Sequence, residues 1–447
     1  MDKIRAISLI LMGLIFLYNI FISNEWLNLF ISILAILVLI LYFPKLIYSS
    51  KILVIAMNLA SIYIYFYSGN LIEYFEDIKT NLAILCIFIF VPFLIVPIRR
   101  GDYLNAIDIV LRKLITNSQR LYGLVKICVI IIGAILNMGS LHILYNFTNL
   151  KSYKAFEEVR MKALIRGVSL AFLWSPYFVS VAVVLSYFNI DWIQIFLFGI
   201  IINIIGILIG YKAEMNNNLP IRNFSTSHNE FRKAIKSILI LIVNIILVTA
   251  LIILIDGFSD VPILSIVPLT VLSYSILWMI LQNNARYIVL DYYKELIDRG
   301  PKMGNEVSVF LSAGLFGSAL LTLGSDKWIL KILDTFEVEN AILLIPILAL
   351  LIIGSSFIGL HPIVTVSTIG VTLSQVTYFM DQHFILAIGI LISWMVTVIL
   401  SPFSSANLIM TGIVNRKSMF DSFRMNYKYA LSLWVIAYFI LIIFSIY

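Results

Sequence analysis

Apolar runs long enough to cross a lipid bilayer recur along almost the whole chain and exclude most other folds. A spanning helix needs about 20 consecutive, mostly apolar residues. Only 12% of the 447 residues are charged, about half the share found in soluble domains. The sequence therefore predicts an all-α polytopic membrane protein rather than a cytosolic enzyme, a secreted disulfide scaffold or a disordered chain. The eleven predicted spans cover residues 4–22, 26–48, 51–68, 81–98, 163–188, 191–211, 237–256, 261–280, 307–324, 384–413 and 429–447.

Two further apolar stretches, 121–145 and 341–377, are interrupted near their middles by small and polar residues. Irregular backbone at membrane depth is tolerated only where protein or a water-filled cavity covers it. We therefore expect each stretch to form a re-entrant helical hairpin, which returns to the side from which it entered. The interrupting residues are Gly133, Asn137, Gly139, Ser140 and His142 in the first stretch, and Gly354, Ser355, Ser356, Gly359, His361 and Pro362 in the second.

The positions of the lysines and arginines predict the orientation. If the N-terminus is cytoplasmic and both hairpins are re-entrant, nearly all of the 31 basic residues fall on the cytoplasmic side, as the positive-inside rule requires. Only Lys79, Lys327 and Lys331 fall outside, and Lys126 lies in the first hairpin. The net charge of +7 is thus a topology signal, and no nucleic-acid partner is expected. The chain is expected in the cell membrane with its C-terminus outside.

The second half of the chain repeats the order of the first. The hairpins read IIGAILNMGSLHI from residue 131 and IIGSSFIGLHPI from residue 352. Amphipathic segments precede them at 101–118 and 325–339, and a Ser-Pro-containing span and one last helix follow each. Because the hairpins enter from opposite sides, the halves form an inverted repeat, which is common in secondary transporters. The predicted units are a leading helix at 1–25, a first repeat at 26–212, a cytoplasmic linker at 213–236 and a second repeat at 237–447.

The candidate site lies where the hairpin tips meet the two Ser-Pro spans. Proline removes an amide donor and breaks a helix, which exposes helix ends near the bilayer midplane. Helix N-termini attract anions, whereas C-termini and unwound carbonyls coordinate sodium. A Ser-Pro that only kinks its helix, or a histidine that only completes a packing hydrogen bond, is the alternative for each half; either histidine could also carry protons. The predicted substrate- or ion-binding residues are Asn137, Gly139, Ser140, His142, Ser175, Pro176, Ser180, Ser355, Ser356, Gly359, His361, Ser401, Pro402, Ser404, Ser405 and Asn407.

The remaining charged residues are expected to have structural roles, and no catalytic motif is found. Lys126 is expected to extend its amine to the membrane surface, and Arg166 is expected at the start of a helix. A countercharge for the substrate is the alternative for both. The segment 283–299 is expected to be an amphipathic helix on the cytoplasmic surface. No Walker loop, HExxH or Cys/His cluster occurs. We therefore expect no enzyme, no catalytic residue, no cofactor and no metal beyond a sodium ion at the residues above; a sodium ion or a proton is the expected coupling ion.

The predicted arrangement resembles the ion transporter superfamily, and in particular the divalent anion:sodium symporter fold. The likeness covers nearly the whole chain in architecture. The symporters of that family carry Ser-Asn-Thr signatures, whereas this chain has Asn137-Met138-Gly139 and Gly354-Ser355-Ser356 at the tips and Ser404-Ser405-Ala406-Asn407 in the second broken span. The resemblance implies a midplane site, a homodimer and an elevator motion. In that motion the segments 101–118 and 325–339 would connect a mobile unit to a fixed scaffold.

These features favour a secondary active transporter in the lipid bilayer, which moves a small anionic solute such as a carboxylate or oxyanion. The inverted repeat and the scarcity of acidic residues within the predicted spans support this function. Two alternatives stay open at this stage. One is a flippase for lipid or polyprenyl phosphate, which would use the same repeats with a lateral opening. The other is a membrane-embedded enzyme of envelope-polymer assembly, although the outer loops are short for such an enzyme.

Overall fold

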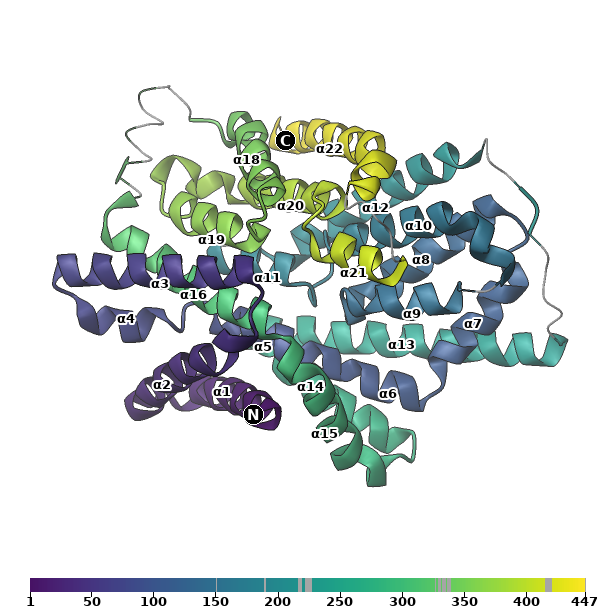
Figure 1. Ribbon diagram of the computed structural model, residues 1–447, viewed down its shortest axis with the longest axis horizontal. Helices are drawn as coiled ribbons and strands as arrows, with labels where there is room; N and C mark the ends of the chain where they lie inside the picture. Colours follow the sequence, from purple (N-terminus) through teal and green to yellow (C-terminus); the bar gives the residue numbers. More distant parts are fainter. Residues whose placement is uncertain are drawn as a thin grey trace.

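The secondary structure elements of the computed structural model are helices (Figure 1). The structure describes residues 1–149, 151–188, 190–215, 219–221, 227–325, 327–328, 331, 335, 339–414 and 420–446. The helices before residue 216 are α1 (Asp2–Ile22), α2 (Glu25–Tyr42), η1 (Phe43–Lys45), α3 (Tyr48–Ser68), α4 (Leu71–Asp77), α5 (Leu82–Phe90), η2 (Val91–Leu94), α6 (Ile95–Arg100), α7 (Tyr103–Leu114), α8 (Ser118–Leu136), α9 (Gly139–Phe147), η3 (Lys151–Phe156), α10 (Glu157–Ala171), α11 (Val179–Tyr187) and α12 (Trp192–Ala213). The later helices are α13 (His228–Phe258), α14 (Ile263–Leu281), η5 (Ala285–Tyr287), α15 (Ile288–Arg299), η6 (Gly300–Lys302), α16 (Gly304–Thr322), α18 (Ala341–Phe357), α19 (Pro362–Leu373), η7 (Thr377–Gln382), α20 (His383–Leu400), α21 (Ser405–Val414) and α22 (Asp421–Ile446).

Eleven helices or helix runs in the described part of the chain are long and apolar enough to cross a membrane. The prediction of an all-α polytopic membrane protein is therefore confirmed. The set of long helices differs from the expected one in one place. α8, within the first predicted hairpin, has 19 residues and is long enough by itself. The predicted span 163–188 is instead two short helices, α10 with 15 residues and α11 with 9, because the chain leaves the helical path around Pro176.

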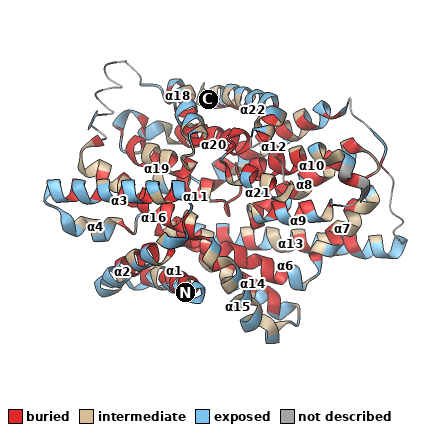
Figure 2. Ribbon diagram, viewed as in Figure 1, coloured by how far each residue is buried: buried red, intermediate tan, exposed pale blue. Residues whose placement is uncertain are grey.

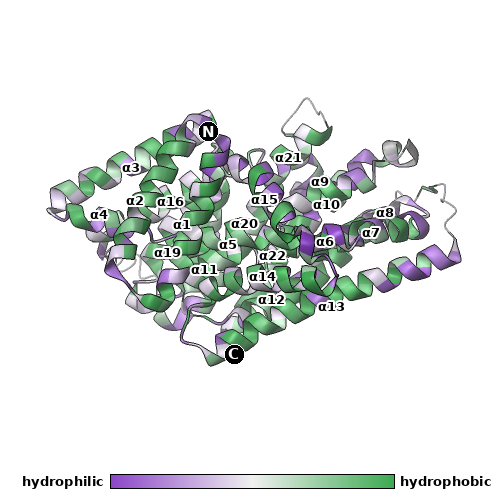
Figure 3. Cartoon of the chain, turned by 90° about the horizontal axis from the view of Figure 1, so that it is seen from below, coloured by the Kyte–Doolittle hydropathy of each residue, from purple (hydrophilic) through white to green (hydrophobic). Residues whose placement is uncertain are grey.

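The predicted cytoplasmic linker is shorter than expected, because α13 begins at His228 rather than near residue 237. A capping box explains the early start. The Ser227 hydroxyl accepts the Glu230 amide, and the Glu230 carboxylate accepts the Ser227 amide, both at 3.2 Å. α13 is apolar along most of its length and polar at one end (Figure 3). Only 17% of its most apolar window is buried, so its side chains are available to lipid.

The helices divide into a buried centre and an exposed periphery (Figure 2). In the runs Leu71–Arg100 and Thr377–Val414, 89% of the most apolar window is buried. α5, α11 and α20 lie near the middle in this view, whereas α2, α3 and α13 are exposed over much of their surface. Large apolar side chains such as Leu59 and Leu254 are more than half exposed on these outer helices. In water such a surface would aggregate, and in a bilayer it is solvated by lipid.

The packing around the two predicted hairpins follows the same order in both halves. α8 packs against α9 and α10, and α10 packs against α12. In the second half, α18 packs against α19 and α20, and α20 packs against α22. α10 and α20 also contact each other. The helices that precede the two Ser-Pro sequences therefore meet inside the protein.

Candidate functional site

Both Ser-Pro sequences interrupt a helix with the same turn. α10 ends at Ala171 and α11 begins at Val179, while α20 ends at Leu400 and α21 begins at Ser405. In the first break, the amide of the residue three after the serine donates to the serine carbonyl at 3.0 Å; in the second, the corresponding distance is 3.1 Å. The proline in each turn lacks an amide donor, and this prevents the helix from continuing.

The hydroxyl of each break serine binds the neighbouring helix pair. Ser175 Oγ donates to the carbonyl of Ala134 in α8 at 2.6 Å. Ser401 Oγ donates to the carbonyl of Ser356 in α18 at 3.0 Å. In both cases the amide two residues after the serine donates to the hydroxyl at 3.2 Å. All four residues are buried or nearly so. Each hydroxyl therefore fixes the break against the last turn of the preceding helix pair.

Substituting alanine for Ser401 or Ser175 is expected to lower the free energy of unfolding by about 1–2 kcal/mol. Each substitution removes the donor to a buried carbonyl and the acceptor for the amide two residues later. Ser186→Ala is the matched control, because its hydroxyl only donates to Val183 within the same helix. Thermal unfolding in detergent measures the effect. Equal midpoint temperatures for the three variants would contradict the proposed role of the break serines.

The two helix-pair turns also depend on specific residues. Asn137, between α8 and α9, has a φ of 52°, which asparagine tolerates better than most residues. Its amide Nδ2 donates to the carbonyl of Tyr177 in the first break at 3.1 Å. The Ser140 hydroxyl donates to the Asn137 carbonyl at 2.8 Å. The second turn uses Gly359, whose φ is 91°, a conformation suited to glycine.

A cavity of about 520 Å³ lies between the helix-pair turns and the two breaks. The first residues of four helices line it: Gly139 of α9, Val179 of α11, Pro362 of α19 and Ser405 of α21. Two of these helices carry side-chain caps, since His361 Nδ1 accepts the Ile363 amide at 3.3 Å and Ser404 Oγ accepts the Asn407 amide at 3.3 Å. Helix N-termini carry partial positive charge and free amide donors. Their convergence gives the cavity an environment suited to an anion.

Charged side chains form another part of the cavity wall. Arg99, Arg299 and Lys302 supply three cations, and Glu295 and Glu306 supply two carboxylates. Arg99 and Glu295 pair at 2.8 Å. Burial lowers the pKa of Arg299 to about 10, and Glu295 and Glu306 act in the opposite direction. A pKa of about 10 leaves Arg299 charged at neutral pH, so the wall has one more positive than negative charge when both carboxylates are ionised.

Most of the remaining wall is apolar and aromatic. Phe88, Phe172, Phe178, Phe310 and Trp394 all line the cavity. The Phe172 ring lies 5.1 Å from Trp394 and 5.3 Å from Phe178, between ring centroids. Binding sites for organic molecules typically combine such apolar walls with a few polar groups that fix orientation. The cavity therefore suits an anion that has an apolar body.

The structure brings some of the predicted site residues to the cavity and leaves others behind it. Six of them line the cavity: Asn137, Gly139, His142, His361, Ser404 and Ser405. The others do not, and several of these form hydrogen bonds that hold the breaks. Ser180 Oγ donates to the Phe172 carbonyl at 2.7 Å, and Asn407 Nδ2 donates to the Ser401 carbonyl at 2.8 Å. The ten residues outside the lining are Ser140, Ser175, Pro176, Ser180, Ser355, Ser356, Gly359, Ser401, Pro402 and Asn407.

The five charged lining residues were missing from the predicted site. Three of them come from 295–302, at the end of the segment expected to be a surface helix or just after it. α15 is indeed a helix, but Arg100 of α6 pairs with its Asp291 through two hydrogen bonds of 2.5 and 2.8 Å. This contact helps place the end of α15 at the cavity. In the sequence, only the mixed charge of this segment could have indicated a cavity wall, and mixed charge fits a solvated surface equally well.

Two buried cations lie outside the cavity, and both expectations for them are wrong. Lys126 does not extend to the surface: its amine donates to the Gly206 carbonyl at 2.7 Å and to the Tyr429 and Tyr122 hydroxyls at 3.0 and 3.1 Å. These contacts require that residue 210 has no side chain. A Cβ on Gly210 would overlap the Tyr122 hydroxyl and would lie 2.8 Å from the Lys126 amine. The glycine therefore provides the space that this contact needs.

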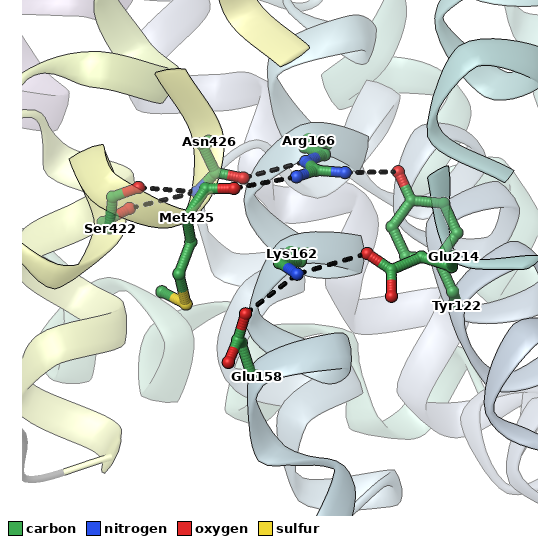
Figure 4. A network of polar contacts seen from close by, with 8 residues as sticks. All are labelled: Tyr122, Glu158, Lys162, Arg166, Glu214, Ser422, Met425 and Asn426. Atoms are coloured by element: carbon green, nitrogen blue, oxygen red, sulfur yellow. Dashed lines mark hydrogen bonds and ion pairs between the residues drawn. The ribbon is translucent and has the colours of Figure 1, made fainter. Parts of the chain in front are cut away.

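Arg166 lies in the middle of α10 rather than at a helix start, and it joins three helices (Figure 4). Its guanidinium donates to Asn426 Oδ1 at 2.8 Å, to the Met425 carbonyl at 3.0 Å and to the Tyr122 hydroxyl at 3.4 Å. On the same helix, Lys162 pairs with carboxylates at 2.8 and 3.3 Å. The network connects α8, α10 and α22 beside the site.

No protein-family model and no curated protein sequence matches the chain. The class of the protein therefore rests on its fold and its cavity. The described residues contain no group of three or more histidine, cysteine, aspartate or glutamate side chains that could hold a metal ion. The chain is a polytopic α-helical membrane protein with a partly cationic, partly aromatic cavity beside two broken helices.

Proposed function

We propose that the protein is a secondary active transporter of a small organic anion. The observation that carries this proposal is the convergence of four helix N-termini on one cavity that Arg99, Arg299 and Lys302 also line. In a low-dielectric interior, fixed amide dipoles and cations stabilise an anion more strongly than they do in water. The aromatic wall supplies contact area for the apolar part of the solute.

We further propose that α8–α12 and α18–α22 are inverted repeats with re-entrant hairpins. Three features support the repeat: the same Ser-Pro turn, the same serine hydrogen bond to the preceding helix pair, and the same packing order. Each hydrogen bond joins a hairpin to its broken helix. Such joints suit a hairpin and broken helix that move together through the membrane.

The proposed mechanism is an elevator motion within a homodimer in the cell membrane, driven by a sodium or proton gradient. The N-terminus would be cytoplasmic and the C-terminus outside. α7 falls within the first predicted connecting segment, 101–118. Most of the second such segment, 325–339, lies outside the described residues. With this orientation, the charged wall of the cavity belongs to cytoplasmic segments, and the cavity would open inward.

Transport by the purified chain in liposomes tests the proposal. The probes are radiolabelled benzenesulfonate, succinate and sulfate, offered under an inward sodium gradient or an inward proton gradient. We expect gradient-dependent uptake of benzenesulfonate above that of empty liposomes, because a sulfonate on a ring matches both the N-termini and the aromatic wall. Absence of uptake for all three probes under both gradients would contradict the function. Movement of a fluorescent lipid phosphate instead would favour a flippase.

A further inference from the structure

One of the two carboxylates that line the cavity has an oxygen without a hydrogen-bond partner among the described residues. Glu306 lies in the first turn of α16 and lines the cavity. Its Oε2 atom is buried and has no hydrogen-bond partner among the described residues. An ionised carboxylate oxygen normally accepts several hydrogen bonds when it is buried. A protonated carboxyl group would instead have a hydrogen to donate to a ligand in the cavity.

The other lining carboxylate, Glu295, has a salt-bridge partner. Glu295 pairs with Arg99 at 2.8 Å across two helices, α15 and α6. Glu306 forms no salt bridge in the described part of the chain, although Arg299 acts on it electrostatically. The two carboxylates are thus a natural matched pair for experiment. One pairs with an arginine, and the other lines the cavity and has an unpartnered oxygen.

The other titratable groups around Glu306 do not provide that missing partner. Among the groups that line the cavity, the cations Arg99, Arg299 and Lys302 favour the ionised form, and Glu295 opposes it. His142 and His361 line the cavity from α9 and from the start of α19, and His361 Nδ1 is already the cap of its helix. Elements that pack against α16 carry further titratable groups outside the cavity lining, among them Tyr42 of α2, Lys45 of η1, Tyr48 and Lys51 of α3, and Cys86 of α5.

An anion in this cavity and an ionised Glu306 would repel each other, since like charges close together disfavour ionisation. Protonation of Glu306 removes the repulsion and converts its unpartnered oxygen into part of a hydrogen-bond donor. Binding of the anion and of the proton therefore favour each other, and the effect is reciprocal. The stoichiometry is one proton for each anion. One proton from water adds to the Glu306 carboxylate when the anion binds, and it leaves when the anion is released.

We infer that Glu306 carries the coupling proton, so that the protein is an anion:proton symporter. The inference rests on the proposed transport function and adds the identity of the coupling ion and of its carrier. With a single such group, the apparent affinity for the anion is independent of pH while Glu306 is protonated. At higher pH it falls by about tenfold per unit, because each unit lowers the protonated fraction tenfold.

Benzenesulfonate is the decisive probe, because it stays ionised at every pH used and cannot carry the proton itself. We expect purified protein to bind it more weakly as the pH rises from about 5 to 8, and its uptake into liposomes to acidify an internal pH dye. In Glu306→Gln, the neutral amide replaces the protonated carboxyl. We expect this variant to bind at all pH values with less than about a threefold change, and to take up no protons.

Glu295→Gln is the matched control and should keep both the pH dependence and the proton uptake. Binding of benzenesulfonate by Glu306→Gln also shows that the variant is folded; if it binds nothing, Glu306→Asp, which retains a carboxylate, should restore pH-dependent binding. Uptake by the wild type without acidification, or acidification that persists in Glu306→Gln, would overturn the assignment and leave the transport function standing. Absence of uptake of benzenesulfonate, succinate and sulfate alike, with or without a gradient, would remove both.

Discussion

Replacement of Arg299 by glutamine is expected to weaken anion binding by about thirtyfold. Arg299 lines the cavity at the end of α15, and it has no salt-bridge partner within the described residues, whereas Arg99 pairs with Glu295. A charge about 7–8 Å from a bound anion, at an effective dielectric constant of about 20, contributes roughly 2 kcal/mol. This corresponds to about a thirtyfold change in Kd. Titration of the purified variant with benzenesulfonate at constant pH measures the change.

Arg286→Gln is the control for Arg299→Gln. Arg286 lies in η5, its guanidinium lies 4.7 Å from the Tyr287 ring, and it does not line the cavity. The substitution Arg286→Gln removes one positive charge, as Arg299→Gln does, from the same part of the chain. It should leave the Kd for benzenesulfonate within about twofold, because exposed charges are screened by salt. Arg299→Lys should retain much of the affinity. If both glutamine variants bind equally well, the anion does not lie near Arg299, and the cationic wall is not part of the site.

The features that the sequence predicts well are those with local causes. Long apolar runs predict the membrane class, because composition alone decides whether a helix can lie in lipid. The breaks at Pro176 and Pro402 follow from the missing amide, and the tight turn at Asn137 follows from residue types that accept unusual backbone angles. These residues lie at the edge of the cavity or directly behind it. The sequence therefore indicates the place of the site.

The features that the sequence misses arise from contacts between distant segments. Arg99 and Glu295 are 196 residues apart, and Arg166 and Asn426 are 260 apart. No local pattern indicates that these residues meet, and each charge alone fits a solvated loop or the end of a helix. The same holds for Lys126, whose hydroxyl and carbonyl acceptors lie 4, 80 and 303 residues away. The sequence thus reveals the polar framework of the cavity but not its charged wall.

Replacement of Arg166 by alanine is expected to lower the free energy of unfolding by about 3 kcal/mol and to disturb the second broken helix. The substitution withdraws donors from Asn426 and from the Met425 carbonyl, each loss costing about 1–3 kcal/mol when buried. Asn426 Nδ2 donates to the Ser422 carbonyl at 2.9 Å, and the Ser422 hydroxyl donates to Asn407 Oδ1 at 2.5 Å. Arg166 therefore supports Asn407, which holds the second break.

Two comparisons separate this role from a general effect of removing charge. Lys45→Ala removes a cation whose 3.9 Å pair with Asp2 is more than half exposed, and it should cost less than about 0.5 kcal/mol. Arg166→Lys keeps the charge but cannot reproduce the planar set of donors. Its free energy of unfolding should therefore lie between those of Arg166→Ala and Lys45→Ala. Thermal unfolding in detergent gives the order of stability, and benzenesulfonate titration of Arg166→Lys measures the effect on the site. An Arg166→Ala variant as stable as Lys45→Ala would mean that the network in Figure 4 does not hold the helices together.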